Sequence, residues 1–390
     1  MTMNRGTTGQ YIVSSTAGES FKAFVPKPLP PEPALQIDAE MQELMNSATL
    51  ALGRLDGLMT ILPEPSLFLY MYIRKEAVLS SQIEGTESSL AELLLFENEE
   101  APGVPIDDVQ EVSNYVAAMS YGLKRLHEGF PLSNRLIREI HEVLLSKGRG
   151  SEKDPGQFRR SQNWIGGSRP GRARYVPPPP DQVTECMSDL EKFLHNEPVK
   201  TTVLVKAALA HVQFETIHPF LDGNGRLGRL LITLLMCSEG VLSQPMLYLS
   251  LYFKANRSHY YDLLQKVRTD GDWEEWLRFF LIGVEETADQ AVQTAKRLLE
   301  LFKADREKLE HHTKATGTLL RVHNFLQRNP ITSIRRAAPK LKLTAPTVTA
   351  AFKIMQELGM VRELTGGQRN RMYAYSQYIS ILSEGTEPNR

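Results

Sequence analysis

Residues 218–229, HPFLDGNGRLGR, bring one imidazole, one carboxylate, three glycines and two guanidinium groups into twelve positions. His218 titrates near neutrality, which suits a general base, and Asp222 is a carboxylate that could hold Mg2+ beside phosphate oxygens. Glycines that open a helix offer free backbone N–H groups to an anion. Arg226 and Arg229 share one face of that helix and could clamp a polyphosphate. The set predicts nucleotidyl or phosphoryl transfer to a hydroxyl group.

The same glycines spell GxGxxG, the pattern of dinucleotide-binding folds. That pattern needs an entering strand and an acidic residue about 20 positions later. Here the entering segment VKAALAHVQFETI is Ala-rich and helical, and the later segment LSQPMLYLS contains no acid. A P-loop is excluded because no Lys-Ser or Lys-Thr pair follows the glycines. Each residue alone is typical of a turn or a solvated helix face, but their co-occurrence favours a phosphate site.

The segment resembles the Fic family motif HxFx(D/E)GNGRxxR at every defined position. The segments 155–180, PGQFRRSQNWIGGSRPGRARYVPPPP, and 252–281, YFKANRSHYYDLLQKVRTDGDWEEWLRFFL, also resemble Fic proteins that end in a winged helix. The resemblance implies a protein adenylyltransferase. Such an enzyme transfers AMP from ATP, with Mg2+, to a Ser, Thr or Tyr hydroxyl of a target protein or of itself, and releases pyrophosphate.

The resemblance also implies a role for individual residues. His218 would be the general base, Asp222 the Mg2+ ligand, and Phe220 the apolar anchor of the loop. A larger group would bind the nucleotide: Gly223, Asn224, Gly225, Arg226, Leu227, Gly228, Arg229, Asn256, Tyr261 and Gln213.

Residues 155–180 have Trp, Ile, Tyr and Val beside Gly and Pro, which predicts a two-stranded hairpin. In the Fic family the matching hairpin is a flap that holds the backbone of the target as an added strand. The resemblance makes Ile165 and Val176 candidates for clamping the modified residue. Without it, an ordinary structural hairpin would be the simpler interpretation.

Residues 80–85, SSQIEG, resemble the family's inhibitory motif (S/T)xxxE(G/N), with Ser80, Glu84 and Gly85 at the defined places. Arg229 can pair fully with the gamma phosphate or with a carboxylate, but not with both. If Glu84 takes Arg229, the alpha phosphate is misaligned, and near-attack geometry is worth several kcal/mol of barrier. We therefore expect a largely autoinhibited protein.

Helical patterns cover most of the chain, so the expected fold class is mainly α. We expect a Fic-type helical bundle with a β-hairpin flap, plus a C-terminal winged helix domain. The expected parts are an extended, proline-rich arm (1–35), an N-terminal helical region (36–105) with the inhibitory helix (66–85), the Fic catalytic core (106–301), a connector (302–316) and the winged helix-turn-helix domain (317–390).

The sequence of the C-terminal part (317–390) predicts three short helices followed by two strands around a Gly-Gly turn. Residues 316–378 carry ten Lys or Arg against two Glu, a local charge of +8 in a chain of net charge −1. One alternative is therefore a DNA-binding regulator whose Fic core senses a nucleotide. Another is a bifunctional enzyme that also removes AMP.

The remaining expectations come from composition. Cys186 and Cys237 are the only cysteines and form neither a disulfide framework nor a metal knuckle, which fits a reducing cytosol and a cytoplasmic protein. The longest apolar run, LLITLLMC, is far shorter than a membrane span of about 20 residues, so no membrane partner is expected. His211 is expected to be a packed core residue, and a homodimer is left open.

Overall fold

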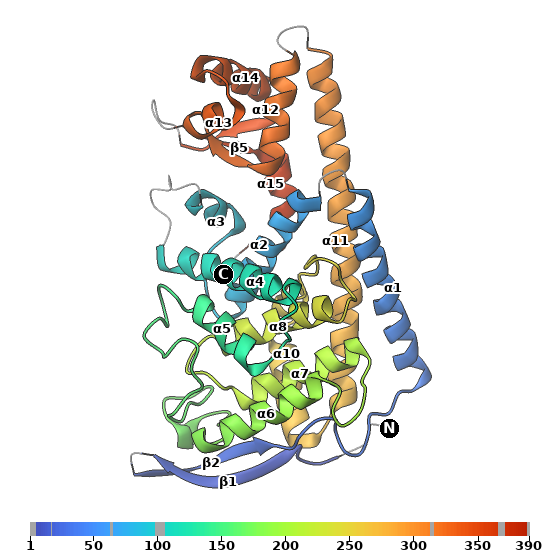
Figure 1. Ribbon diagram of the computed structural model, residues 1–390, viewed down its shortest axis with the longest axis vertical. Coiled ribbons are helices and arrows are strands. Elements are labelled where there is room, and N and C mark those ends of the chain that lie inside the picture. Colours follow the sequence, from blue (N-terminus) through green and yellow to red (C-terminus); the bar gives the residue numbers. More distant parts are fainter. Residues whose placement is uncertain are drawn as a thin grey trace.

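The computed structural model describes residues 5–16, 18–62, 65–97, 106–312, 316–365 and 371–387. The chain is mainly helical (Figure 1), as the sequence predicts. Among these residues, no helix is both long and apolar enough to cross a membrane.

The first ordered element is an antiparallel pair of strands. Strands β1 (Gly9–Thr16) and β2 (Glu19–Pro26) pair from Gly9 opposite Pro26 to Thr16 opposite Glu19. The prediction of an extended arm over residues 1–35 is therefore wrong for this stretch. The prediction relied on the prolines, but these begin only at the end of β2. Residues 27–38, which contain most of them, form no regular element.

The helical body is built from eleven helices between the strand pair and the C-terminal part. They are α1 (Ala39–Ile61), α2 (Pro65–Ile83), α3 (Leu90–Phe96), α4 (Ile106–His127), α5 (Asn134–Leu144), α6 (Val183–Leu194), α7 (Val203–Ile217), α8 (Asn224–Ser238), α9 (Ser250–Ala255), α10 (Arg257–Asp270) and α11 (Trp273–Glu310). Helix α11 has 38 residues and continues through most of the predicted connector. Helix α1 packs along it (Figure 1).

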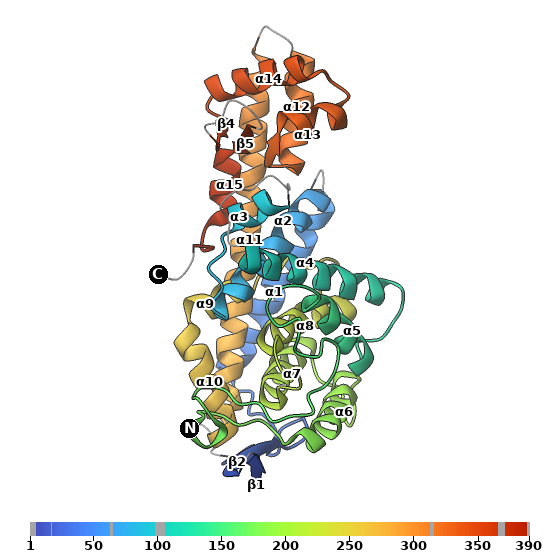
Figure 2. The same ribbon diagram turned by 90° about the vertical axis from the view of Figure 1, so that its left-hand side faces the viewer.

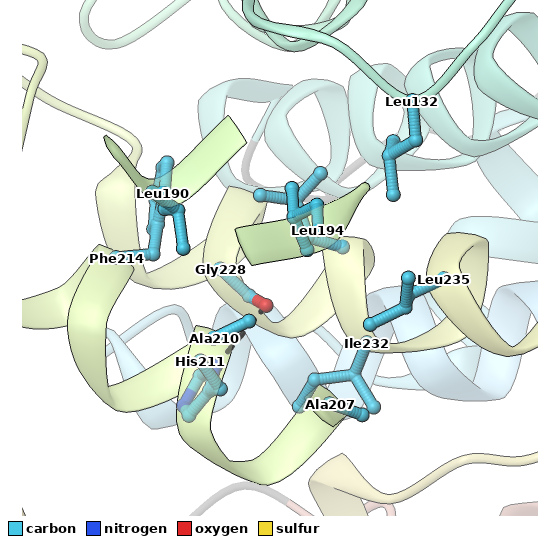
Figure 3. A pocket seen from close by; sticks show the side chains of 11 residues that line it. Leu132, Leu190, Leu194, Ala207, Ala210, His211, Phe214, Gly228, Ile232 and Leu235 are labelled. Carbon is cyan, nitrogen blue, oxygen red and sulfur yellow. Dashed lines mark hydrogen bonds between the residues drawn. The ribbon is translucent and has the colours of Figure 1, made fainter. Parts of the chain in front are cut away.

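Helices α7 and α8 form the centre of the body. Every residue of α7 from Leu204 to Ile217 is buried, including the polar side chains of Lys206, Gln213 and Glu215, so this helix has no solvent-facing side. A cavity of about 20 Å3 lies among α6, α7 and α8 and is lined almost entirely by aliphatic side chains (Figure 3). There Nδ1 of His211 lies 3.1 Å from the carbonyl oxygen of Gly228, and Nε2 lies 2.8 Å from the Tyr260 hydroxyl. His211 is a packed core residue, as predicted, and the cavity is a packing gap that has room for about one water molecule.

The predicted hairpin within residues 155–180 is reduced to one antiparallel bridge between Ile165 and Tyr175. The expectation of two paired strands is therefore wrong. After Ile165, Gly166 and Gly167 have positive φ values of 67° and 98° and turn the chain away from a strand. A short 3-10 helix, Pro170–Arg172, follows, and the prolines after Val176 have no N–H groups for a ladder.

The C-terminal part contains α12 (Thr316–Arg328), β3 (Ile331–Ser333), α13 (Ile334–Leu341), α14 (Ala345–Glu357), β4 (Val361–Glu363), β5 (Met372–Tyr375) and α15 (Ser376–Ser383). The three predicted helices and the two predicted strands are present. Strand β3 completes an antiparallel sheet in the order β3-β5-β4. The predicted Gly-Gly turn at residues 366–367 lies outside the described residues. Figure 2 shows α12, α13 and α14 grouped at one end of the molecule.

Candidate active site

The loop between α7 and α8 has an unusual backbone at both ends. Helix α7 ends at His218, which has a left-handed φ of 49°, and α8 is capped by Gly223 with φ of 76°. A positive φ is uncommon for a residue other than glycine and persists only where the surroundings enforce it. Here the carbonyl oxygen of His218 accepts hydrogen bonds from Nε of Arg159 (2.9 Å) and Nδ2 of Asn163 (3.3 Å). The flap segment therefore fixes the position of His218.

Asn224 closes the loop from its other end. Its Nδ2 donates to the carbonyl oxygen of Phe220 (2.9 Å), and its Oδ1 accepts from the N–H of Phe220 (2.9 Å). The side chain of Asn224 thus shapes the loop. Phe220 is fully buried, which agrees with its predicted role as an anchor.

His141, on α5, is a loop-positioning residue that the sequence did not reveal. Its Nδ1 accepts a hydrogen bond from the N–H of Gly156 (2.9 Å), so Nε2 carries the proton and donates to the carbonyl oxygen of Asp222 (3.0 Å). Its ring stacks on Phe220 with centroids 3.7 Å apart. Burial lowers the pKa of His141 to about 4, so it is neutral at pH 7. On a helix face it looks like any packing residue, and no spacing in the sequence marks it.

A cavity of about 140 Å3 opens where α8 begins. Its lining comes from the loop, the turn after α2, α4 and the stretch after α5: Glu84, Glu111, Arg149, His218, Leu221, Asp222, Gly223, Asn224, Gly225 and Arg226. The first N–H groups of a helix have no intrahelical acceptor and attract anions. Glu111 and Arg149 are the two charged lining residues that the sequence did not suggest.

Arg226 is buried at the base of this cavity. Its Nη1 lies 2.8 Å from Oε1 of Glu111, and its Nη2 lies 3.4 Å from Oδ1 of Asp222. Among the described residues, Nε of Arg226 has no hydrogen-bond acceptor, whereas Nη1 is ion-paired with Glu111. A buried guanidinium with an unfilled donor beside a helix start is suited to an anionic ligand.

Arg229 is held by the segment that resembles the inhibitory motif. Its Nε donates to Oγ of Ser80 (2.9 Å), and its Nη2 donates to the carbonyl oxygen of Ser80 (2.8 Å) and to Oε1 of Glu84 (2.7 Å). Burial acts to raise the pKa of Glu84, but the charges of Arg229 and Arg226 outweigh it and hold that pKa below its usual range. Gly85, with φ of 98°, follows directly. In this state the guanidinium of Arg229 is occupied by protein groups.

The imidazole of His218 faces the cavity without a strong partner. Its Nδ1 lies 3.9 Å from Oε2 of Glu215, too far for a hydrogen bond. Burial, together with the positive charges of Arg159 and Arg268, lowers the pKa of His218 to about 3. The ring is therefore neutral at pH 7 and has a lone pair that can accept a proton.

Asp222 is the candidate ligand for Mg2+. Its Oδ1 accepts the N–H of Gly223 at 2.5 Å. Among the described residues, no group of three or more His, Cys, Asp or Glu side chains could hold a metal alone. Mg2+ commonly takes one or two carboxylates together with substrate phosphates and water. A single carboxylate beside an anion-binding helix start fits that pattern.

Several sequence candidates do not line the cavity. Leu227 is fully buried in the core, and Gly228 packs against Phe214 and Glu215 of α7. The side chain of Leu227 and the close approach at Gly228 therefore support helix packing, and nucleotide binding by these two residues stays a prediction. Val176 is buried against Phe21 and Ala23, and its carbonyl oxygen accepts the N–H of Phe24 (2.9 Å), so β2 covers this proposed clamp.

Four further sequence candidates also lie outside the lining of this cavity. Nε2 of Gln213 donates to the carbonyl oxygen of Lys27 (2.9 Å), which directs it toward the N-terminal strands. Asn256 precedes α10, and its Nδ2 donates to the carbonyl oxygen of Tyr252 (3.0 Å). Tyr261 is partly buried on α10. Ile165, at the bridge, is also only partly buried.

Two family models match separate stretches of the chain. Residues 42–124 match the family model described as Fic/DOC family N-terminal, and residues 131–236 match the model described as Fic/DOC family. Over these residues the chain is similar to the two domains of that family.

Curated relatives that match about half of the chain are named protein adenylyltransferase Fic. The one from Drosophila erecta is 32% identical over 210 residues, which cover 53% of this chain and 39% of the relative. The one from Aedes aegypti is 34% identical over 211 residues, with 53% and 39% coverage. The chain thus spans about two fifths of the length of these relatives.

Solved structures show the same fold. A Fic family protein from Desulfovibrio desulfuricans matches with a TM-score of 0.58 and 20% identity, over 88% of this chain and 97% of that one. A Fic domain containing signaling protein from Bacteroides thetaiotaomicron matches with a TM-score of 0.52 and 20% identity, over 64% of this chain and 97% of that one. The predicted Fic-type helical bundle is confirmed at the level of the fold.

Proposed function

We propose that the protein is a protein adenylyltransferase that transfers AMP from ATP to a hydroxyl side chain of a target protein or of itself. The observation that carries this proposal is the cavity at the start of α8, which gathers the neutral imidazole of His218, the carboxylate of Asp222, the first turn of a helix and the buried guanidinium of Arg226. The names of the relatives over the matched half of the chain support the same activity.

Each group has a chemical task in this reaction. The backbone N–H groups at Asn224 to Arg226 would bind the phosphates of ATP, with Arg226 balancing their charge. His218 would remove the proton from the target hydroxyl as its oxygen attacks the alpha phosphorus, and pyrophosphate would leave. Asp222 would hold Mg2+, which neutralises charge on the phosphate oxygens.

We further propose that the described state is restrained. Arg229 is the cation best placed to follow Arg226 along the polyphosphate, and its Nη2 is bound to Glu84. A gamma phosphate would have to displace a carboxylate that is itself held by charge. Binding of ATP would survive, whereas alignment of the alpha phosphorus for in-line attack would be lost.

The experiment is intact-mass measurement of the Glu84→Gly protein after incubation with ATP and Mg2+, alone and with a cell lysate. We expect a mass increase equal to one AMP on the protein itself or on a lysate protein. The matched control is the Glu84→Gly, His218→Ala double variant, which keeps the opened phosphate site and loses the base. Absence of any increment, or an increment that persists in the control, contradicts the proposal.

A second candidate function is nucleic-acid binding by the C-terminal part, which we interpret as a winged helix. It is favoured by exposed basic side chains along α13, α14 and β4: Arg335, Lys340, Lys342, Lys353 and Arg362. Phosphate contacts by such residues make affinity fall steeply with salt. A gel shift of the full chain with duplex DNA at low and high salt tests this, and no shift at low salt contradicts it.

A further inference from the structure

The last described residues of the chain lie against the helix that carries the inhibitory segment. Helix α15 follows β5 directly and packs on α11, α2 and α3 (Figures 1 and 2). The C-terminal tail, which we define as residues 384–387, then continues to the end of α2. The C-terminal part of the chain thus contacts the end of α2, the helix that directly precedes Glu84.

Gln82 makes the direct connection between α2 and the tail. Its Nε2 donates to the carbonyl oxygen of Thr386 (2.8 Å) and to that of Ser88 (2.9 Å). Gln82 is almost fully buried and precedes Glu84 by two residues. One amide group therefore joins the tail to the turn that positions Glu84.

The tail is anchored on two other helices. Nζ of Lys254 on α9 donates to the carbonyl oxygens of Gly385 (3.2 Å) and Glu387. Arg297 on α11 forms a bidentate ion pair with Glu384, with distances of 2.7 and 2.6 Å. Gly385 has φ of 80°, and a β-carbon there would lie 2.5 Å from Leu251. The tail therefore has a defined conformation that a side chain at Gly385 would disturb.

Charge links the tail to α2 as well. Lys75 on α2 is fully buried, and among the described residues its Nζ has no hydrogen-bond acceptor. The ammonium group lies over the ring of Tyr248, 4.6 Å from its centroid. Burial lowers its pKa to about 8, while the carboxylates of Glu384 and Glu387 favour its charged form. A buried cation left without opposing charge is costly, so α2 depends on the tail.

We propose that the tail is a latch that holds the end of α2 in place and so keeps Glu84 on Arg229. This inference rests on the proposed adenylyl transfer and its restraint by Glu84. Because the tail is continuous with α15 and β5, a ligand that displaces the C-terminal part would release the latch and activate the enzyme.

The latch is tested with two variants that leave α2 unchanged. Lys254→Met removes the anchor on α9, and Gly385→Val disturbs the tail itself. Each is made with Glu84 present and in the Glu84→Gly protein, and Lys192→Met, at an exposed lysine paired with Asp189 on α6, is the matched control. We expect AMP transfer to rise about fivefold or more when Glu84 is present. We expect no further rise in the Glu84→Gly protein, because the latch acts through Glu84.

Two outcomes overturn the latch. One is unchanged transfer in both latch variants while the Glu84→Gly protein is active. The other is an equal rise in both backgrounds, which would mean that the tail acts on catalysis by another route.

Amide hydrogen exchange tests the latch independently of catalysis. The N–H groups of Gly85 and Thr86 donate to the carbonyl oxygens of Gln82 and Ser81 at 3.1 and 3.2 Å. Both amides should exchange about tenfold faster in the latch variants than in Lys192→Met. Unchanged exchange overturns the latch whatever the activity. If Glu84→Gly shows no transfer at all, the proposed function fails, and the exchange rates still decide whether the tail holds this turn.

Discussion

The carboxylate of Glu84 lies 2.7 Å from Nη2 of Arg229, although 145 residues of chain separate them. Arg229 is almost completely buried, and its Nε is bound to Ser80 of the same segment. A phosphate that needs this guanidinium must therefore replace a partner that is already charged and in place. The carboxylate of Glu84 and a phosphate of the nucleotide therefore compete for the guanidinium of Arg229.

The competition predicts a difference between ATP and ADP in a Glu84→Gln protein. The amide keeps the size of the side chain but removes the charge that opposes the gamma phosphate. ATP should bind about tenfold more tightly than it does to the wild type, ~1.4 kcal/mol, whereas ADP, which lacks the gamma phosphate, should change much less. Titration calorimetry with both nucleotides measures this. Equal changes for ATP and ADP would show that Glu84 does not oppose the gamma phosphate.

The pKa of His218 predicts the pH dependence of transfer. The base works in its neutral form, so the rate falls only as the pH drops through the pKa of His218, which burial and the neighbouring Arg159 and Arg268 lower to about 3. The negative charge of Glu84 raises the pKa of His218. Replacing Glu84 by glycine therefore lowers that pKa further. The Glu84→Gly rate at saturating ATP and Mg2+ should therefore show no acid limb near pH 6.5 between pH 8 and 5.5. A limb with its midpoint near the ordinary histidine value would contradict this prediction.

His141 should matter for both stability and metal binding. Replacing it by alanine leaves the N–H of Gly156 and the carbonyl oxygen of Asp222 without their partner and removes the stack on Phe220. We expect a loss of about 2–4 kcal/mol in the free energy of unfolding. In the Glu84→Gly background we expect about a tenfold or greater rise in the Mg2+ concentration for half-maximal transfer, because Asp222 loses its support.

The matched control for His141 is His127→Ala, at an exposed histidine near the end of α4. Chemical denaturation and a Mg2+ titration of transfer are measured on both variants. If His141→Ala lowers stability but leaves the Mg2+ requirement equal to that of the control, His141 is structural and does not position Asp222.

Local patterns in the sequence predicted most of the helices but not how distant segments meet. Spacing of apolar residues placed α4 to α8 because buried helices repeat their contacts every three to four positions. The strands β1 and β2 were missed because the prolines beside them suggested an extended arm, whereas their stability depends on Phe21 and Ala23 meeting Val176. That contact joins residues more than 150 positions apart and leaves no local signal.

The candidate site divides in the same way. Glycines, Asp222, His218 and the two arginines stand in one continuous segment, so their chemistry could be predicted from types and spacing. Three other residues lie beside the loop only because α4, α5 and the stretch after α5 pack against it: Glu111, His141 and Arg149. The sequence does not reveal such contacts, because they depend on how distant helices pack. Leu227 and Gly228 lie within the motif but on the buried side of α8, because a helix turns neighbouring residues toward different faces.

We infer that Glu84 restrains AMP transfer by occupying Arg229. The inference is tested by the rate of AMP incorporation by the wild-type and Glu84→Gly proteins at equal concentration, with saturating ATP and Mg2+. We expect the Glu84→Gly protein to be faster by at least about tenfold, which corresponds to ~1.4 kcal/mol of barrier. Equal rates in the two proteins would show that Glu84 does not restrain the reaction.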